Sequence, residues 1–166
     1  MLTKMLGEIK ILILDVDGVL TDGRISINDR GEETKSFNVK DGYGIRLLLD
    51  AGIDVAIITG RQSKSVEHRA RDLGINRIYQ GIADKKSICI RLLEEKQLTK
   101  DQACFIGDDL PDIPILKIVG LPVAVADAVK EVRETARYIT EKNGGNGAVR
   151  EVCELILKAQ GAWPRI

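Results

Sequence analysis

Residues 11–22 read ILILDVDGVLTD, and this stretch decides the fold. Four consecutive apolar residues that favour strands run directly into two aspartates, Asp15 and Asp17, and then Gly18. An apolar run of this length predicts a strand buried on both faces, as in a parallel sheet. Carboxylates at the end of such a strand fall in the crevice where open α/β sheets bind ligands. Taken alone, the segment fits an ordinary Asp-Gly turn equally well.

The composition is that of an ordinary globular protein. The chain has 166 residues, 44% of them hydrophobic, and 25 basic residues balance 25 acidic ones. This predicts a single domain over residues 1–166 and gives no reason to expect nucleic acid as a partner. No apolar stretch approaches the ~18 residues of a membrane span, so no membrane partner is expected. Cys89, Cys104 and Cys153 lie in apolar surroundings, which predicts buried thiols in a reducing cytoplasm.

Beyond the first strand, the pattern alternates between strands and helices. A β-hairpin is expected over about residues 23–39, and the Asp-Gly-Tyr-Gly segment at 41–44 is expected to break the chain before the next helix. The glycine-rich segment 143–147 is expected to be a flexible approach to the last helix. Further strands are expected at 53–58, 77–79, 103–106 and 121–125, and further helices at 63–73, 85–95, 128–137 and 149–160. The predicted fold class is α/β, a Rossmann-like doubly wound parallel sheet.

Polar side chains follow three of the predicted strands. Thr59 follows the second strand of the sheet, and the pair Asp108 and Asp109 follows a later one; Lys85 begins a helix. Carboxylates from two strand ends suit a hard cation such as Mg²⁺, and a hydroxyl and an ammonium suit phosphate oxygens. Each has a plainer explanation alone: a turn, a solvated charge, or a helix cap. Together and in this order they indicate phosphoryl transfer.

These four motifs resemble those of the haloacid dehalogenase (HAD) superfamily of aspartate-nucleophile phosphatases. The matching segments are DVDGVLTD at 15–22, TGR at 59–61, the later lysine and GDDLPD at 107–112, and the resemblance covers nearly the whole chain. Between the motifs there is room only for the hairpin, so no cap domain is expected.

The resemblance implies a role for each motif residue. Asp15 resembles the nucleophile that forms an aspartyl-phosphate, and Asp17 resembles the general acid and base. Thr59 and Lys85 would contact the phosphate, with Lys86 as a competing candidate for the lysine. The residues expected to hold Mg²⁺ are Asp15, Asp17 (also through its backbone carbonyl) and Asp108, with Asp109 and Asp112 as outer or structural carboxylates.

Two further stretches, FNVKDGYGI at 37–45 and GGNGAVREV at 144–152, resemble the capless phosphatases of 3-deoxy-D-manno-octulosonate 8-phosphate. That family of tetrameric enzymes supplies a sugar acid of bacterial lipopolysaccharide. The resemblance implies a homotetramer with active sites at subunit interfaces. Because the tail, residues 160–166, is apolar, it is expected to lie over a neighbouring active site as a partial lid. The residues expected to contact the sugar-acid phosphate are Asp17, Asn38, Val39, Lys40, Asp41, Gly42, Arg46, Thr59, Gly60, Arg61, Arg69 and Lys85.

Two alternatives to this function stay open at the level of sequence. A related phosphatase would act on a sialic-acid-type 9-phosphate, and a non-catalytic domain of the same fold would serve as a scaffold or regulator. The intact pair Asp15 and Asp17 argues against the second. For Lys40 and Arg46, simple surface charge is an alternative to substrate contact.

Overall fold

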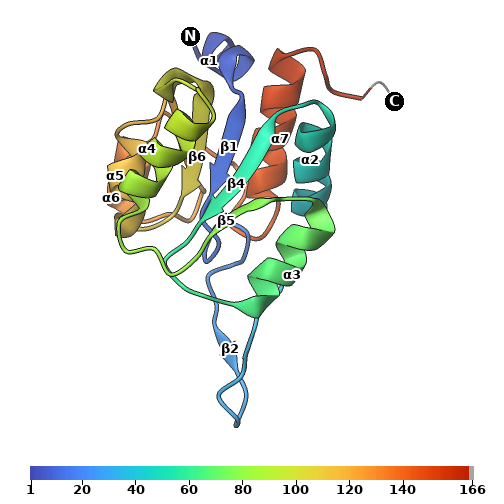
Figure 1. The fold of residues 1–166 in the computed structure, drawn as a ribbon, viewed down its shortest axis with the longest axis vertical. Coiled ribbons are helices and arrows are strands. Elements are labelled where there is room, and N and C mark those ends of the chain that lie inside the picture. Colours follow the sequence, from blue (N-terminus) through green and yellow to red (C-terminus); the bar gives the residue numbers. More distant parts are fainter. Residues whose placement is uncertain (165–166) are drawn as a thin grey trace.

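Six parallel strands form the central sheet in the computed structural model, which describes residues 1–164. Their spatial order is β5-β4-β1-β6-β7-β8, so β1 lies in the interior of the sheet (Figure 1). The strands are β1 (Ile11–Leu14), β4 (Asp54–Ile58), β5 (Arg77–Tyr79), β6 (Ala103–Gly107), β7 (Leu121–Ala124) and β8 (Tyr138–Ile139). The fold is therefore the expected α/β sheet without a cap domain, and β8 is an addition to the strands predicted from the sequence.

The register of β1 explains why the polar strand ends converge. Leu14 lies opposite Ile57 of β4 and opposite Ile106 of β6. Asp15, Thr59 and Asp108 follow these three strands and therefore emerge at one edge of the sheet. All four residues of β1 have no exposed surface, as expected for a strand covered on both faces.

Helices cover both faces of the sheet. The helices α2, α3 and α7 lie on one face, and α4, α5 and α6 lie on the other (Figure 1). Among residues 1–164, no helix combines the length and the apolar character needed to cross a membrane. The helices are α1 (Leu2–Glu8), α2 (Val39–Asp50), α3 (Lys64–Leu73), α4 (Lys85–Glu95), α5 (Ile113–Leu116), α6 (Lys130–Thr135) and α7 (Ala148–Ala159), with short 3₁₀ turns at Lys100–Gln102 and Leu110–Asp112.

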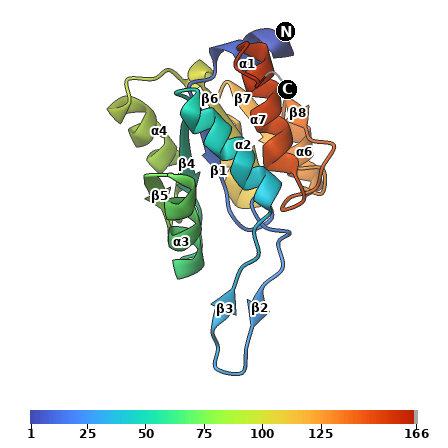
Figure 2. The same cartoon turned by 90° about the vertical axis from the view of Figure 1, so that its right-hand side faces the viewer.

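The expected hairpin is present and projects from the edge of the sheet at which the site residues emerge (Figure 2). Its strands β2 (Ser26–Ile27) and β3 (Glu33–Thr34) pair antiparallel and are shorter than the sequence pattern predicted. The side chain of Asn28 closes the turn by accepting hydrogen bonds from the backbone N–H groups of Arg30 and Glu32. A two-stranded hairpin of this length has little stability of its own.

The start of α2 corrects one prediction from the sequence. Residues 41–44 do not break the chain, because α2 already begins at Val39, where the Asn38 side chain accepts a hydrogen bond from the backbone N–H of Lys40. The two glycines instead allow close helix packing. A Cβ atom on Gly42 would lie 2.2 Å from the guanidinium of Arg69 in α3, and one on Gly44 would lie 3.0 Å from Arg150 in α7.

The glycine-rich segment before α7 corrects a second prediction. It was expected to be flexible, but it packs tightly against the loop that follows β1. The backbone N–H of Gly145 donates to the carbonyl of Val19, and a Cβ atom on Gly144 would lie 1.7 Å from the carbonyl oxygen of Gly18. The glycines are therefore required by close approach of two backbones, not by mobility.

Candidate active site

Asp15 and Lys85 form the centre of the site. Asp15 follows β1, and the Nζ atom of Lys85 lies 3.0 Å from its Oδ1 and 2.7 Å from Oδ1 of Asp112. All three side chains are buried. Asp84 caps α4 by accepting from the N–H of Ser87, so the helix starts beside the site with Lys85 pointing inward and Lys86 exposed. Of the two candidate lysines, Lys85 therefore lies among the carboxylates of the site and Lys86 is exposed.

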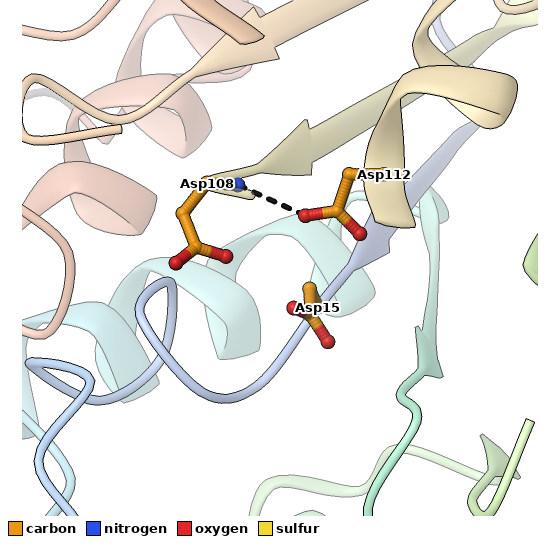
Figure 3. A group of neighbouring side chains, drawn as sticks. All are labelled: Asp15, Asp108 and Asp112. Carbon is orange, nitrogen blue, oxygen red and sulfur yellow. Dashed lines mark hydrogen bonds between the residues drawn. The ribbon is translucent and has the colours of Figure 1, made fainter. Parts of the chain in front are cut away.

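Three carboxylates converge from the ends of β1 and β6 (Figure 3). One ligand oxygen of each of Asp15, Asp108 and Asp112 lies within 4.8 Å of the others. Asp112 is fixed by the backbone N–H of Asp108, which donates to its Oδ2 at 2.9 Å. Gly18 (φ 87°) lets the loop after β1 approach this cluster, since a Cβ atom there would lie 2.0 Å from Oδ2 of Asp108.

The electrostatics of this cluster are those of a cation site. Burial, together with the carboxylates of Asp15, Asp112 and Asp109, raises the pKa of Asp108 to about 8. Burial and Asp112 raise the pKa of Asp15 to about 6 against the opposing charge of Lys85. Oδ1 of Asp108 is buried and has no hydrogen-bond partner among residues 1–164. A hard divalent cation would relieve the repulsion and satisfy that oxygen, so the residues present fit Mg²⁺.

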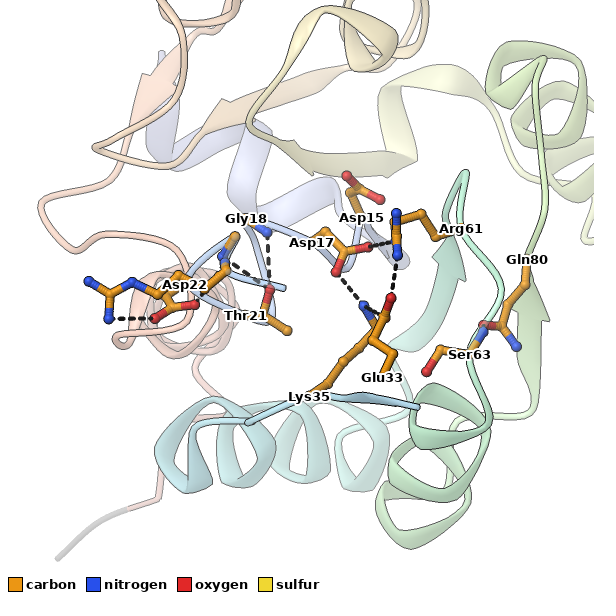
Figure 4. Close-up of polar contacts among 12 residues, drawn as sticks. Asp15, Asp17, Gly18, Thr21, Asp22, Glu33, Lys35, Arg61, Ser63 and Gln80 are labelled. Atoms are coloured by element: carbon orange, nitrogen blue, oxygen red, sulfur yellow. Dashed lines mark hydrogen bonds and ion pairs between the residues drawn. The ribbon is translucent and has the colours of Figure 1, made fainter. Parts of the chain in front are cut away.

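The side chain of Asp17 lies outside the triad of carboxylates and points toward the hairpin (Figure 4). The Nζ atom of Lys35 lies 2.5 Å from Oδ1 of Asp17 and 2.7 Å from Oε1 of Glu33. Glu33 also forms an ion pair with Arg61, whose Nε lies 3.9 Å from Oδ2 of Asp17. Any metal contact from Asp17 is therefore left to its backbone carbonyl, the route already considered from the sequence.

A cavity of about 480 Å³ opens above these groups. Its size suits a phosphorylated small molecule, which matches the usual range for ligand pockets. Five of the sequence-derived candidates for substrate contact line it, namely Asp17, Thr59, Gly60, Arg61 and Lys85. The full lining is Asp15, Asp17, Thr59, Gly60, Arg61, Gly81, Ile82, Ala83, Lys85, Asp108, Asp109, Pro111 and Asp112.

The other candidates for substrate contact lie outside this cavity. Asp41 is buried and accepts a hydrogen bond from the backbone N–H of Arg150, so it caps α7 from a neighbouring helix. Arg69 packs beside Gly42, and Asn38 caps α2. The side chains of Val39, Lys40 and Arg46 are exposed. Within one chain these residues build or border α2; contact with substrate would require a neighbouring subunit.

Residues 160–164, the described part of the tail, lie far from the site of their own chain. The Trp163 ring packs under two cations of α7, with its centroid 5.2 Å from the guanidinium carbon of Arg150 and 5.3 Å from Nζ of Lys158. The end of α7, which leads into the tail, lies at the opposite end of the sheet from the hairpin (Figure 1). Residues 165 and 166 of the expected lid lie outside the described part of the chain.

Two residues of the site were missed by reasoning from sequence: Glu33 and Lys35. Both lie on the second arm of the hairpin, two positions apart, which places them on the same face of an extended segment. That spacing indicates that the two side chains can pair with each other, but not that they reach Asp17.

Comparison with known proteins finds relatives among the haloacid dehalogenase-like hydrolases. Residues 74–152 match the family of haloacid dehalogenase-like hydrolases. The chain is 55% identical over 154 residues to the 3-deoxy-D-manno-octulosonate 8-phosphate phosphatase KdsC of Yersinia pestis, covering 93% of this chain and 82% of that protein.

Solved structures agree with this comparison. A crystal structure of the Yersinia pestis phosphatase superposes with a TM-score of 0.95 at 52% identity, covering 97% of this chain and 87% of that one. The phosphatase of Moraxella catarrhalis, crystallised with magnesium ion, phosphate ion and KDO, superposes with a TM-score of 0.94 at 46% identity, covering 96% and 92%.

Proposed function

The chain belongs to the 3-deoxy-D-manno-octulosonate 8-phosphate phosphatases of the haloacid dehalogenase-like hydrolases, and on that premise we propose that it hydrolyses this sugar-acid phosphate with Mg²⁺. The products are 3-deoxy-D-manno-octulosonate, a precursor for lipopolysaccharide, and inorganic phosphate. The observation that carries the proposal is the buried Asp15–Lys85 pair beside two further carboxylates, at the floor of a cavity.

Asp15 is assigned as the nucleophile. Its carboxylate attacks phosphorus, the bond from phosphorus to the sugar oxygen breaks, and an aspartyl-phosphate forms. Asp15 and Asp108, with Asp112 beside them, would hold Mg²⁺, which would supply positive charge that offsets the repulsion between the carboxylate and the phosphate. Lys85 holds Asp15 in place, and its ammonium and the hydroxyl of Thr59 are positioned to contact phosphate oxygens.

Asp17 is assigned as the general acid and base. In the first step it gives a proton to the departing sugar oxygen, and in the second it removes one from the water that hydrolyses the aspartyl-phosphate. Its position two residues after Asp15, on the cavity wall, suits both tasks. Arg61, on the same wall, is a charge that can contact an anionic substrate.

The test is phosphate release from purified sugar-acid phosphates at fixed Mg²⁺. We expect the highest kcat/KM for 3-deoxy-D-manno-octulosonate 8-phosphate and a lower value for a sialic-acid-type 9-phosphate. Equal or better turnover of the nine-carbon substrate would overturn the assignment of substrate. Absence of all phosphate release would instead favour the non-catalytic alternative.

We also propose that the chain forms a homotetramer through its hairpin, with active sites at the interfaces. Large apolar side chains are exposed along the hairpin and the start of α2: Ile27 is 62% exposed and Val39 is 75% exposed, and Ile25 and Tyr43 are exposed beside them. Burial of these side chains against another subunit would remove apolar surface from water. Contacts between hairpins would also cover the exposed edges of β2 and β3.

A pair of matched variants tests the assembly. Ile27→Asp should reduce the molar mass in light scattering from tetramer toward monomer, because it places a charge in the proposed interface. Ile139→Asp is the control, since Ile139 is an exposed isoleucine on β8, away from the hairpin. Equal masses for both variants and the unmodified protein would contradict the proposed interface. The interface also provides the neighbour that Lys40, Arg46 and the tail would need in order to reach an active site.

We infer a cytoplasmic location from the three cysteines. Cys89, Cys104 and Cys153 are free and buried, and burial raises the pKa of each thiol. Unpaired thiols are typical of a reducing compartment. Fractionation of the source cells with an antibody against the protein would test this location.

A further inference from the structure

Lys35 occupies an unusual position for a lysine on a hairpin. Its side chain is only 2% exposed, although β3 ends one residue earlier on a projecting arm. The ammonium lies between two carboxylates, those of Asp17 and Glu33 (Figure 4). Lysine is rarely buried unless it is paired, so the burial of Lys35 depends on its two carboxylate partners.

The pairing keeps Lys35 charged. Burial lowers the pKa of its ammonium, but the hydrogen bonds and charges of Asp17 and Glu33 outweigh burial and leave the pKa raised. Glu33 is itself bound to Arg61, so it fixes Lys35 relative to the cavity wall. The link from hairpin to site therefore passes through a defined ion-pair network.

The two oxygens of Asp17 are thereby made different. Oδ1 accepts the hydrogen bond from Lys35 at 2.5 Å, whereas Nε of Arg61 lies 3.9 Å from Oδ2, beyond hydrogen-bond distance. Oδ2 is left as the atom that can carry a proton. A neutral Asp17 can still accept from Lys35 at Oδ1 while its Oδ2–H group donates to a substrate oxygen.

We propose that Lys35 is a positioning residue for the general acid, holding Asp17 through Oδ1 so that Oδ2 faces the leaving oxygen. The inference rests on the proposed phosphatase function. As the bond from phosphorus to oxygen breaks, the proton on Oδ2 passes to the leaving oxygen, and the electron pair left on Asp17 is stabilised by the ammonium of Lys35. The hairpin thus completes the site of its own chain, in addition to any contact with other subunits.

The test compares two substrates that differ in their need for a proton. An alkyl phosphate such as glycerol 2-phosphate has a poor leaving group, whereas p-nitrophenyl phosphate has one that departs without protonation. kcat/KM reports the steps up to release of that group. In Lys35→Met, we expect kcat/KM for the alkyl ester to fall by about 10–100-fold, up to the lower limit of the usual contribution of general acid catalysis, because Asp17 itself is kept. For p-nitrophenyl phosphate the fall should be under about 3-fold.

Two further variants separate positioning from general damage. Lys35→Arg keeps a charged donor and should restore most of the alkyl ester activity. Lys96→Met removes another partly buried lysine, paired with Asp54 at a distance from the cavity, and should leave both values unchanged. If Lys35→Met fails to fold, Glu33→Gln provides the test. It removes one of the two carboxylate partners of Lys35, so kcat/KM should again fall more for the alkyl ester than for p-nitrophenyl phosphate, but by a smaller factor.

Equal falls for both substrates, or no fall for either, would overturn the proposal. Neither ester is the sugar-acid phosphate, so the result is independent of the assignment of substrate. Failure to act on any sugar-acid phosphate would overturn the proposed function while leaving the ratio between the two esters interpretable.

Discussion

The carboxylates around Lys85 are held by the ends of buried strands, whereas those around Lys35 are held across a hairpin of two short strands. The first group is buried and fixed by backbone N–H groups. The second reaches the surface, where the side chain of Arg61 is 48% exposed. A rigid scaffold therefore holds the groups assigned to attack and metal binding, and a more exposed element holds the group assigned to proton transfer.

This difference has an energetic consequence. Separating one member of the buried group leaves charges without a partner in a low-dielectric interior, at a cost of about 3–5 kcal/mol. Separating the exposed pair of Glu33 and Arg61 costs only about 0–1 kcal/mol, because water solvates the guanidinium that is left. Variants that separate Lys85 from Asp15 or Asp112 should therefore affect both chemistry and stability, whereas Glu33→Gln should affect chemistry with little change in stability.

The largest effect is expected for Asp15→Asn. The amide is nearly isosteric but is not a nucleophile, so kcat should fall by about 10⁴-fold or more, as it does on removal of other covalent nucleophiles. The measurement is phosphate release at saturating substrate, with circular dichroism to check that the fold is kept. Activity near that of the unmodified protein would exclude Asp15 as the nucleophile.

Removal of the metal should affect the carboxylates around Lys85, which are assigned to metal binding, and not the ion pairs of the hairpin. A chelator should abolish activity, and excess Mg²⁺ should restore it. Mg²⁺ at ~100 times its Kd should raise the free energy of unfolding by about 2.7 kcal/mol. For a chain of this size, this corresponds to an increase in Tm of roughly 5–10 °C, which thermal unfolding with and without Mg²⁺ would measure.

The matched variant for this experiment is Asp108→Asn. It should lose most of the Mg²⁺-dependent shift in Tm, and its metal-free form should be at least as stable as the metal-free unmodified protein, because one of the mutually repelling carboxylates is gone. An unchanged Mg²⁺ shift in this variant would show that the cation binds elsewhere.

The buried group was largely predictable from the sequence, because each member follows a strongly patterned element. The run ending in Asp15 could only be a buried strand, and parallel strands present their ends at one edge. The start of α2 was not predictable in the same way. Residues 41–44 have poor helix propensity, and only packing against Arg69 and Arg150 shows why glycine is required inside a helix.

Contacts that join distant segments were also out of reach. Lys35 and Asp17 are 18 positions apart and meet only because the hairpin folds back on the site. The packing of Gly144 against the carbonyl of Gly18 joins residues still further apart in the chain. Neither contact has a local signature, since both depend on the path of a loop in space.

Two glycines with positive φ angles, one beside the buried group and one in the hairpin, allow a direct comparison of the two regions. Gly18 (φ 87°) lies against Asp108, and Gly31 (φ 77°) lies in the hairpin turn with open space around it. Both alanine variants should lose about 1 kcal/mol through the positive φ. Only Gly18→Ala should also lose activity, by about 10²-fold, because the methyl group displaces Asp108. The measurements are urea unfolding and kcat/KM; equal activity in the two variants would contradict the close packing around Gly18.

The smallest change in stability is expected for Glu33→Gln. Lys35 and Arg61 hold the pKa of Glu33 below its ordinary value of 4.5, so its contribution to stability is present above that pH and is lost as pH falls below it. At pH 7 urea unfolding should therefore detect a loss of under about 1 kcal/mol, which shrinks further in high salt.

The control is Glu154→Gln, since Glu154 also binds two cations, Arg150 and Lys158, on the outer side of α7. Both variants should have similarly small effects on unfolding, but only Glu33→Gln should change the ratio of kcat/KM between alkyl and p-nitrophenyl esters. A loss above about 2 kcal/mol at Glu33 would mean that the hairpin is as firmly held as the buried group, since exposed ion pairs do not contribute that much. In that case the proposed difference in stability between the buried group around Lys85 and the hairpin group around Lys35 would be wrong.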